Sequence, residues 1–378
     1  IPSVENVQDI VIEVLKRNGY EKVANEYQDY RKKKEEIREL KERLGIIEPK
    51  LTVNALEVLR RRYLLKNEKE SIIETPTWMF RRIAEAVANI DKQYDKDPNE
   101  TEKIFYEMMA KLEFIPNSPT LFNAGTEIGQ LSACFVLPVE DSLESIFTTV
   151  KNMALIEQTG GGVGFDFSKL RPNGDVVRST KGVASGPVSF MRVFDTATEV
   201  IKAGGKRRGA MMGILRVDHP DIVEFITSKQ KSGLLSNFNI SVAVTDDFMR
   251  TLRKKEKYWL INPRNRNKTR KLEAQNIWDL MIKSAWMSGD PGVVFIDEIN
   301  RHNPTSEVGR IEATNPCGEQ PLLAYESCNL GSINLSRMIE NGKIDWKKLR
   351  ETVRNAVHFL DNVIDANKYP LKEIEAIT

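Results

Sequence analysis

Residues 133–167 read ACFVLPVEDSLESIFTTVKNMALIEQTGGGVGFDF, and this stretch decides the fold class. The apolar runs at 133–137 and 163–167 have the length and composition of buried strands, whereas the segment 143–158 between them has the periodicity of a helix. A strand, a helix and a second strand in succession form the repeating unit of a parallel sheet. An α/β fold is therefore predicted.

The same alternation continues toward the C-terminus. An irregular stretch that contains residues 315–328 interrupts it before the last strand. Further strands are predicted at 211–215, 238–244, 293–296 and 329–335, and further helices at 187–201, 220–229, 274–288 and 346–366.

The chain before about residue 115 is predicted to be all-helical. Thr75 and Pro76 are a capping residue and a favoured first-turn residue. The segment 26–44 mixes both signs of charge at helical spacing, which favours a solvated helix or linker over a nucleic-acid-binding patch. Apolar side chains recur at helical spacing in 4–17, 53–63, 76–90 and 102–112.

Length and composition bound the class of protein. A chain of 378 residues suggests two or three domains. No apolar run approaches the roughly 20 residues that span a bilayer, and the net charge of +2 gives no reason to expect a nucleic acid partner. Residues 1–5 lack an initiator Met and a signal-peptide core, so we expect a piece of a longer cytoplasmic protein that does not bind membranes.

The three cysteines are Cys134, Cys317 and Cys328. No two of them have the spacing of zinc ligands, so no metal site is predicted, and an odd number does not suggest a structural disulfide framework. They are either ordinary reduced thiols or functional ones. Cys134 and Cys328 both lie where a predicted strand begins, and if those strands are neighbours the two thiols can form a reversibly oxidised pair beside Cys317.

The pentapeptide 315–319 combines an amide, a thiol and a carboxylate. Pro316 disfavours a helical conformation for Asn315, so an extended chain is predicted in which Asn315, Cys317 and Glu319 share one face. A thiol beside a potential base suits a reaction that activates an alcohol next to a sulfur-centred step. The alternative is an Asn-Pro turn with an incidental cysteine.

Two glycine-rich segments suggest contact with a nucleotide. The run 160–164 is not a dinucleotide fingerprint, because Asp166 and Phe167 stand where a third glycine is required, and no Walker A sequence occurs. Bare glycines nevertheless expose backbone N–H groups that can approach a ribose or phosphate. The segment 202–208 mounts basic residues on glycines, either as a nucleotide-binding loop or as an ordinary surface loop.

Several short motifs occur in order along the chain. They are Asn117-Ser118-Pro119-Thr120, Ser132-Ala133-Cys134, the glycine run with Phe165, Gly204-Gly205-Lys206-Arg207-Arg208-Gly209-Ala210, Asp218-His219-Pro220-Asp221-Ile222, the pentapeptide 315–319 and Ser332-Ile333-Asn334-Leu335. Together they resemble the large catalytic subunit of ribonucleotide reductases, and most closely the adenosylcobalamin-dependent class. The resemblance covers roughly residues 50–378.

The resemblance implies a division of the chain. Residues 1–35 resemble the end of an ATP-cone domain, 36–115 a helical domain, and 116–378 the first half of a ten-stranded α/β barrel. The later strands, a substrate phosphate loop and a C-terminal cysteine pair are expected beyond Thr378.

The resemblance also implies catalytic roles. Cys317 would carry a transient thiyl radical that abstracts the ribose 3′ hydrogen, Glu319 would take the 3′-hydroxyl proton, and Asn315 would hydrogen-bond the same region. Cys134 and Cys328 would supply the reducing equivalents and end as a disulfide, with Cys134 protonating the departing 2′-hydroxyl.

Nucleotide contacts follow from the same resemblance. A deoxynucleoside triphosphate effector is expected near Asp141 and Arg171, and the loop 202–209, through Lys202, Lys206 and Arg207, would link the effector base to the substrate base. Many relatives carry Gln where this chain has Ala203. The implied substrate-binding residues are Thr120, Ala133, Cys134, Gly161, Gly162, Asn315, Pro316, Cys317, Gly318 and Glu319.

The implied cofactor is adenosylcobalamin, and the implied ligands are ATP and deoxynucleoside triphosphates. The expected partners are a thioredoxin- or glutaredoxin-type reductant and a second copy of the chain, while a diphosphate or a triphosphate substrate fits equally. One alternative is the large subunit of a reductase that uses a diiron or dimanganese partner. Another is a non-catalytic nucleotide-binding regulatory protein, which would need the glycine loops but not the pentapeptide.

Overall fold

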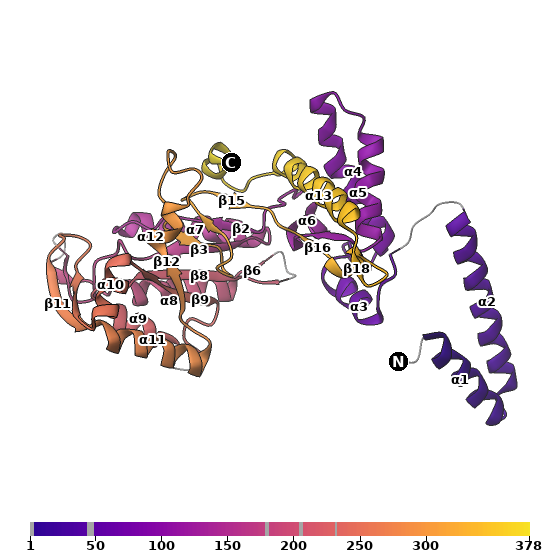
Figure 1. Ribbon diagram of the computed structural model, residues 1–378, viewed down its shortest axis with the longest axis horizontal. Helices are drawn as coiled ribbons and strands as arrows, with labels where there is room; N and C mark the ends of the chain where they lie inside the picture. Colours follow the sequence, from indigo (N-terminus) through magenta and orange to yellow (C-terminus); the bar gives the residue numbers. More distant parts are fainter. Residues whose placement is uncertain (1–3, 44–48, 178–180, 204–206, 231–232) are drawn as a thin grey trace.

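The computed structural model describes residues 4–43, 49–177, 181–203, 207–230 and 233–378 (Figure 1). The chain forms a helical region and an α/β region built around one sheet. The first third of the chain supplies most of the helical region. The predicted fold class, a helical N-terminal region followed by an α/β region, is confirmed. None of the helices in these residues is long and apolar enough to span a bilayer.

Helices form where apolar spacing and capping predict them. In α4 (Pro76–Ala88), the Thr75 side chain accepts a hydrogen bond from Trp78 N at 3.3 Å, and Pro76 occupies the first turn. The other helices of this part are α1 (Val4–Arg17), α2 (Glu21–Arg43), α3 (Val53–Arg62), α5 (Pro98–Ala110) and α6 (Ser118–Asn123).

A helix from the far end of the chain completes the helical region. The helix α13 (Trp346–Ala366) packs against α4 and α5, although it follows the α/β region in sequence (Figure 1). Phe359 of α13 meets Phe105 with ring centroids 5.0 Å apart. Buried Asp91 accepts hydrogen bonds from His358 Nε2 and Asn362 Nδ2, each at 2.8 Å. Apolar packing and a buried polar contact thus join α13 to the helices α4 and α5, far before it in the sequence.

The main sheet has six strands in the order β12-β9-β8-β3-β2-β15. The five strands from β12 to β2 are parallel, and β15 runs antiparallel to β2. Parallel strands are buried on both faces, which explains their almost continuous apolar sequence. The strands are β2 (Cys134–Val136), β3 (Gly162–Asp166), β8 (Met211–Arg216), β9 (Phe238–Val244), β12 (Gly292–Phe295) and β15 (Ser327–Cys328).

Helices between the strands bury the aromatic core of the sheet. Phe165, Phe194 and Phe238 are among the fully buried side chains, and the rings of Phe165 and Phe194 are 4.9 Å apart. These helices are α7 (Leu143–Gln158), α8 (Pro187–Val200), α9 (Ile222–Thr227), α10 (Asp246–Lys254) and α11 (Ala274–Ser288), whereas α12 (Ile296–Arg301) buries Ile296 in a separate apolar cluster. Small hairpins project from this body: β4 (Val176–Val177) with β5 (Gly182–Val183), β6 (Lys202–Ala203) with β7 (Arg207–Arg208), and β10 (Lys257–Ile261) with β11 (Lys268–Glu273).

The predicted strand at 329–335 is wrong in extent and position. Only Gly331–Ile333 forms a strand, β16, and it pairs with β1 (Phe114–Pro116) rather than with the main sheet. The preceding residues Ser327–Cys328 form β15 and join β2 instead. Apolar alternation cannot distinguish these outcomes, because pairing depends on which distant strand offers a free edge.

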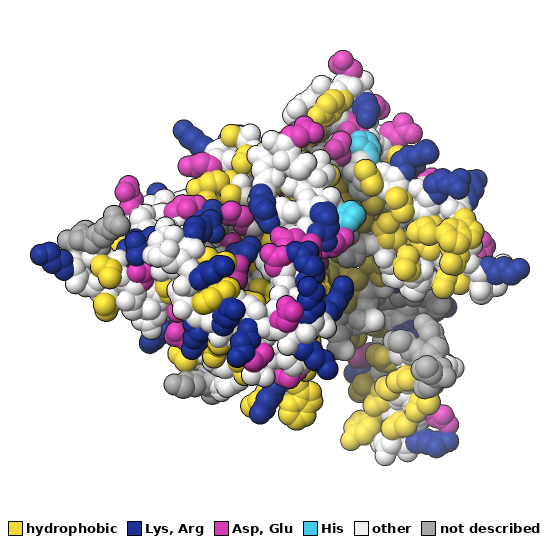
Figure 2. Space-filling model, turned by 60° about the vertical axis from the view of Figure 1, so that its left-hand side comes forward, with side chains coloured by type: hydrophobic (Ala, Val, Ile, Leu, Met, Phe, Trp, Pro, Cys, Tyr) yellow, Lys and Arg dark blue, Asp and Glu magenta, His cyan; other side chains and the backbone are white. Residues whose placement is uncertain are grey.

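Basic and acidic side chains occur together on the face of the molecule drawn in Figure 2. On the face seen in Figure 2, Lys and Arg side chains are numerous near the centre and are interspersed with Asp and Glu. This distribution matches the near balance of 56 basic and 54 acidic residues.

Candidate active site

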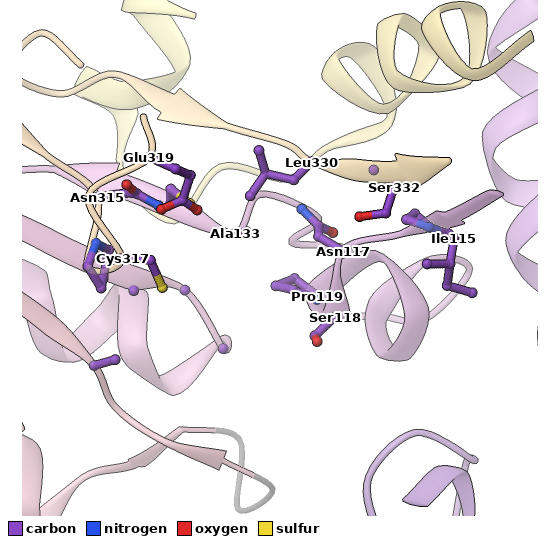
Figure 3. Close-up of a pocket in the computed structure, with 18 residues that line it drawn as sticks. Ile115, Asn117, Ser118, Pro119, Ala133, Asn315, Cys317, Glu319, Leu330 and Ser332 are labelled. Atoms are coloured by element: carbon purple, nitrogen blue, oxygen red, sulfur yellow. The ribbon is translucent and has the colours of Figure 1, made fainter. Parts of the chain in front are cut away.

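A cavity of about 300 Å³ lies at the amino ends of strands β2, β3 and β8. Its walls come from the start of the sheet and from the segment around α6 and β16. Figure 3 shows Asn315, Cys317 and Glu319 at one side of the cavity, and Asn117, Pro119 and Ser332 at the other. Ligands of open α/β sheets usually bind at the carboxyl ends of strands, so the general rule would have misplaced this site.

Residues 315–320, which we call the Cys317 turn, join β13 (Ala313–Thr314) to β14 (Pro321–Leu322). Asn315 N donates to Gln320 O at 3.0 Å, Gly318 N donates to Asn315 O at 3.1 Å, and Gly318 has φ +82°. The predicted extended conformation is therefore wrong, because Gly318 permits a positive φ that closes a tight turn. Asn315, Cys317 and Glu319 nevertheless all line the cavity.

Two glycines of β3 make room for the Cys317 turn. A Cβ on Gly162 would lie 2.7 Å from Pro316 Cγ, and a Cβ on Gly164 would lie 1.7 Å from Thr314 O. Residues two apart share a face of a strand, so the glycines clear one continuous strip of β3. The glycine run therefore has a packing role, in addition to the expected contact of its backbone N–H groups with a nucleotide.

Two side-chain amides anchor the turn. Asn315 Nδ2 donates to Cys134 Sγ at 3.2 Å, and Asn239 Nδ2 on β9 donates to Pro316 O at 2.7 Å. Asn315 Oδ1 also accepts from Gln320 N at 3.0 Å. The thiol of Cys317 is exposed, while the backbone on either side of it is held by these contacts.

Cys134 and Cys328 lie opposite each other as cross-strand partners of β2 and β15. Neither is disulfide-bonded, with Cys134 buried and Cys328 half-buried. A hydrogen bond with Cys134, together with burial, raises the pKa of Cys328, and the negative charge of Glu319 adds to this shift. The Cys328 thiol therefore keeps its proton at neutral pH.

Most of the expected substrate residues line the cavity, but two do not. The hydroxyl of Thr120 is buried and donates to Asn117 Oδ1 at 2.6 Å, and neither Thr120 nor Gly318 is part of the cavity lining. The expected substrate-binding residues that line the cavity are Ala133, Cys134, Gly161, Gly162, Asn315, Pro316, Cys317 and Glu319.

Other lining residues were not assigned from the sequence. The motifs 117–120 and 332–335 contain four of them, namely Asn117, Ser118, Pro119 and Ser332, so these motifs held a signal for the cavity. The unassigned lining residues are Ile115, Pro116, Asn117, Ser118, Pro119, Gly160, Ala210, Leu330, Gly331 and Ser332.

None of the expected effector residues that the structure describes is part of the cavity lining. Asp141 and Arg171 follow the carboxyl ends of β2 and β3, and Arg171 Nε donates to Asp141 Oδ2 at 2.9 Å. Lys202 and Arg207 belong to the β6–β7 hairpin, and Lys206 is outside the described residues. In the part of the chain with described positions, no group of three His, Cys, Asp or Glu residues could hold a metal ion.

Comparison with known proteins identifies the family. Residues 132–378 match the ribonucleotide reductase barrel domain, and residues 49–129 match the ribonucleotide reductase all-alpha domain. The chain is 51% identical to a vitamin B12-dependent ribonucleoside-diphosphate reductase of Thermoplasma acidophilum, over 100% of this chain and 57% of that protein. A protein of the same description from Mycobacterium tuberculosis is 48% identical, over 99% of this chain and 54% of its own length.

A vitamin B12-dependent ribonucleotide reductase of Streptomyces coelicolor is 33% identical over 88% of this chain and 37% of that protein. The chain thus spans about half the length of the two more similar relatives. Both family matches agree with the order of regions found in the structure, which places helices before the sheet. The chain therefore belongs to the ribonucleotide reductase large-subunit family.

Proposed function

We propose that the protein containing this chain reduces ribonucleotides to 2′-deoxyribonucleotides for DNA synthesis. The observation that carries the proposal is the arrangement of Cys134 and Cys328 as cross-strand partners, with Asn315 linking Cys134 to the Cys317 turn. A reaction that consumes one dithiol and uses one further thiol requires such a set. A non-catalytic nucleotide-binding protein would have no use for it.

The proposed residue roles balance the reaction. A thiyl radical at Cys317 removes the 3′ hydrogen atom, and Glu319 accepts the 3′-hydroxyl proton and later returns it, while Asn315 orients the same hydroxyl. Cys134 protonates the departing 2′-hydroxyl, which leaves as water. Cys134 and Cys328 together supply two electrons and two protons and become a disulfide, and Cys317 returns its hydrogen to C3′.

Adenosylcobalamin, when bound, would supply the radical for Cys317. The exposed thiol of Cys317 at the open cavity supports this, because a radical source must approach it from outside the chain. The Thermoplasma acidophilum and Mycobacterium tuberculosis relatives are described as vitamin B12-dependent, which adds support. They favour this class over a reductase that draws its radical from a diiron or dimanganese partner.

Nucleotide control and assembly are part of the same proposal. Deoxynucleoside triphosphates would bind near Asp141, Arg171 and the segment 202–207, with ATP as a further effector. Leu143 and Phe147 on α7 and Val200 on α8 are 63%, 53% and 77% exposed, which suits burial against a second copy of the chain. A thioredoxin- or glutaredoxin-type protein would reduce the disulfide, and three cysteines that form no disulfide in the structure suit the reducing cytoplasm.

The test is single turnover without external reductant, performed on the full-length protein with adenosylcobalamin, an effector and a ribonucleotide. We expect one deoxyribonucleotide per active site and a Cys134–Cys328 disulfide in peptide mapping. In Cys317→Ser, neither product should appear, while nucleotide binding stays near the parent value. Product formation by Cys317→Ser, or a disulfide that includes Cys317, would overturn the proposal.

A further inference from the structure

Glu157, at the C-terminal end of α7, is a fully buried carboxyl group outside the cavity lining. Its Oε1 accepts a hydrogen bond from Thr198 Oγ1 of α8 at 3.1 Å. Among the described residues, its Oε2 is buried without any hydrogen-bond partner. Buried polar atoms nearly always find partners, so an orphan carboxyl oxygen requires a reason.

The side chain of Glu157 lies beside residues on both flanks of the β6–β7 hairpin. Thr198 belongs to α8, four residues before β6, and Gly209 directly follows β7. A Cβ on Gly209 would lie 2.7 Å from Glu157 Oε1 and 2.6 Å from Thr198 Cγ2, so glycine is required for this close approach. The carboxyl group therefore bonds the helix that leads into the hairpin and packs against the residue that leaves it.

The backbone of Glu157 reaches the cavity wall. Gly160 N donates to Glu157 O at 2.9 Å, and Gly160, Gly161 and Gly162 line the cavity. One residue thus contacts the hairpin base through its side chain and the cavity wall through its main chain. A movement at either place would therefore need to pass through only one residue to reach the other.

We propose that Glu157 is a positioning residue that couples the β6–β7 hairpin to the substrate cavity and so takes part in effector-dependent substrate choice. This inference rests on the proposed function. The orphan Oε2 supports it because a hydrogen-bond donor brought near by a second hairpin arrangement would stabilise that arrangement. Coupling between two sites needs an element with two such states.

The electrostatics of the group agree with this role. Burial raises the pKa of Glu157 to about 7, although the hydrogen bond from Thr198 opposes the shift. A carboxyl group in this range can be neutral in one hairpin arrangement and ionised in another. A purely structural acceptor would be expected to have all its oxygen atoms paired.

The experiment uses the full-length protein and compares Glu157→Gln with the parent. The measurement is the ratio of reduction rates for two competing ribonucleotides, with and without each deoxynucleoside triphosphate. Couplings of about 5–150-fold are typical of allosteric proteins. We expect Glu157→Gln to reduce the effector-induced change in the ratio at least fivefold and to lower the unassisted rate by less than about twofold.

Three controls keep the inference separate from folding and from the proposed function. Glu199→Gln, at an exposed glutamate one residue after Thr198, should behave like the parent. Thr198→Val should weaken effector response as Glu157→Gln does, whereas Thr198→Ser, which keeps the hydroxyl, should restore it. Thermal unfolding of each variant reports stability independently.

The outcomes are distinguishable. If the parent protein forms no deoxyribonucleotide, the proposed function fails. If the parent responds to effectors and Glu157→Gln and Thr198→Val respond equally well, only the coupling role fails. If Glu157→Gln lowers assisted and unassisted rates by the same factor, the residue is merely structural and the inference is overturned.

Discussion

The packing of the Cys317 turn on β3 makes a sharp prediction for Gly164→Ala. The added Cβ would lie 1.7 Å from Thr314 O, whereas real Cβ atoms essentially never approach within 3.0 Å. The obstacle is a backbone carbonyl, so no side-chain rotation can relieve the clash. The base of the β13–β14 hairpin must therefore retreat by more than about 1 Å, and Asn315 and Cys317 move with it.

The expected losses differ in size for activity and stability. Misplacement of a reacting group by about 1 Å costs on the order of 10²-fold in rate. Overpacking typically costs about 1–3 kcal/mol of unfolding free energy, which most domains tolerate. We therefore expect a folded Gly164→Ala protein whose deoxyribonucleotide formation is about a hundredfold slower, as measured by chromatography of the products and by thermal unfolding.

A matched substitution separates the clash from a general effect of alanine. A Cβ on Gly309 would meet Leu323 Cδ2 at 3.6 Å, an ordinary contact, so Gly309→Ala should keep the parent rate. Parent-like turnover by Gly164→Ala would refute the packing argument. An equal loss in both variants would show that the region responds to any substitution.

Three further perturbations test other parts of the structure. Asn239→Ala removes the hydrogen bond to Pro316 O, which holds the Cys317 turn in place. Such a bond contributes about 1 kcal/mol of free energy, so its loss should lower kcat several-fold and leave KM nearly unchanged. Iodoacetamide at pH 8 should modify exposed Cys317 well before Cys328, because a hydrogen bond with Cys134 and burial raise the pKa of Cys328. Mass mapping that finds Cys328 modified first would contradict this order. Burial opposes the ionisation of Asp91, but hydrogen bonds from Thr101, Asn362 and His358 outweigh this effect and lower the pKa of Asp91. The ionised carboxylate therefore stabilises the folded protein above about pH 4, and this stabilisation is lost as the pH falls through the pKa of Asp91 in the folded state. The thermal midpoint of Asp91→Asn should therefore fall less between pH 5 and about pH 2 than that of the parent, and an equal fall would exclude Asp91 as a source of acid sensitivity.

Local sequence determined the type and the approximate bounds of most elements. The helices α1, α7, α11 and α13 and the strand β9 have the predicted bounds to within one residue, because the burial of one face or of both faces imposes a period on the local sequence. Capping follows the same logic at Thr75, where the side chain satisfies an N–H group of its own helix. The ordered motifs were likewise sufficient to predict the family, since each motif is a short contiguous string.

Tertiary structure decided what these elements meet. Cys134 and Cys328 are partners only because β15 pairs with the free edge of β2. The residues next to either cysteine in the sequence do not predict which strand edge is free. The conformation of residues 315–320 was wrongly predicted as extended because the local rule for Pro316 was applied without the hairpin that closes around Gly318. Gly164 illustrates the physical reason most directly: its lack of a side chain is visible in the sequence, but the carbonyl group of Thr314 that requires it arrives from a distant strand.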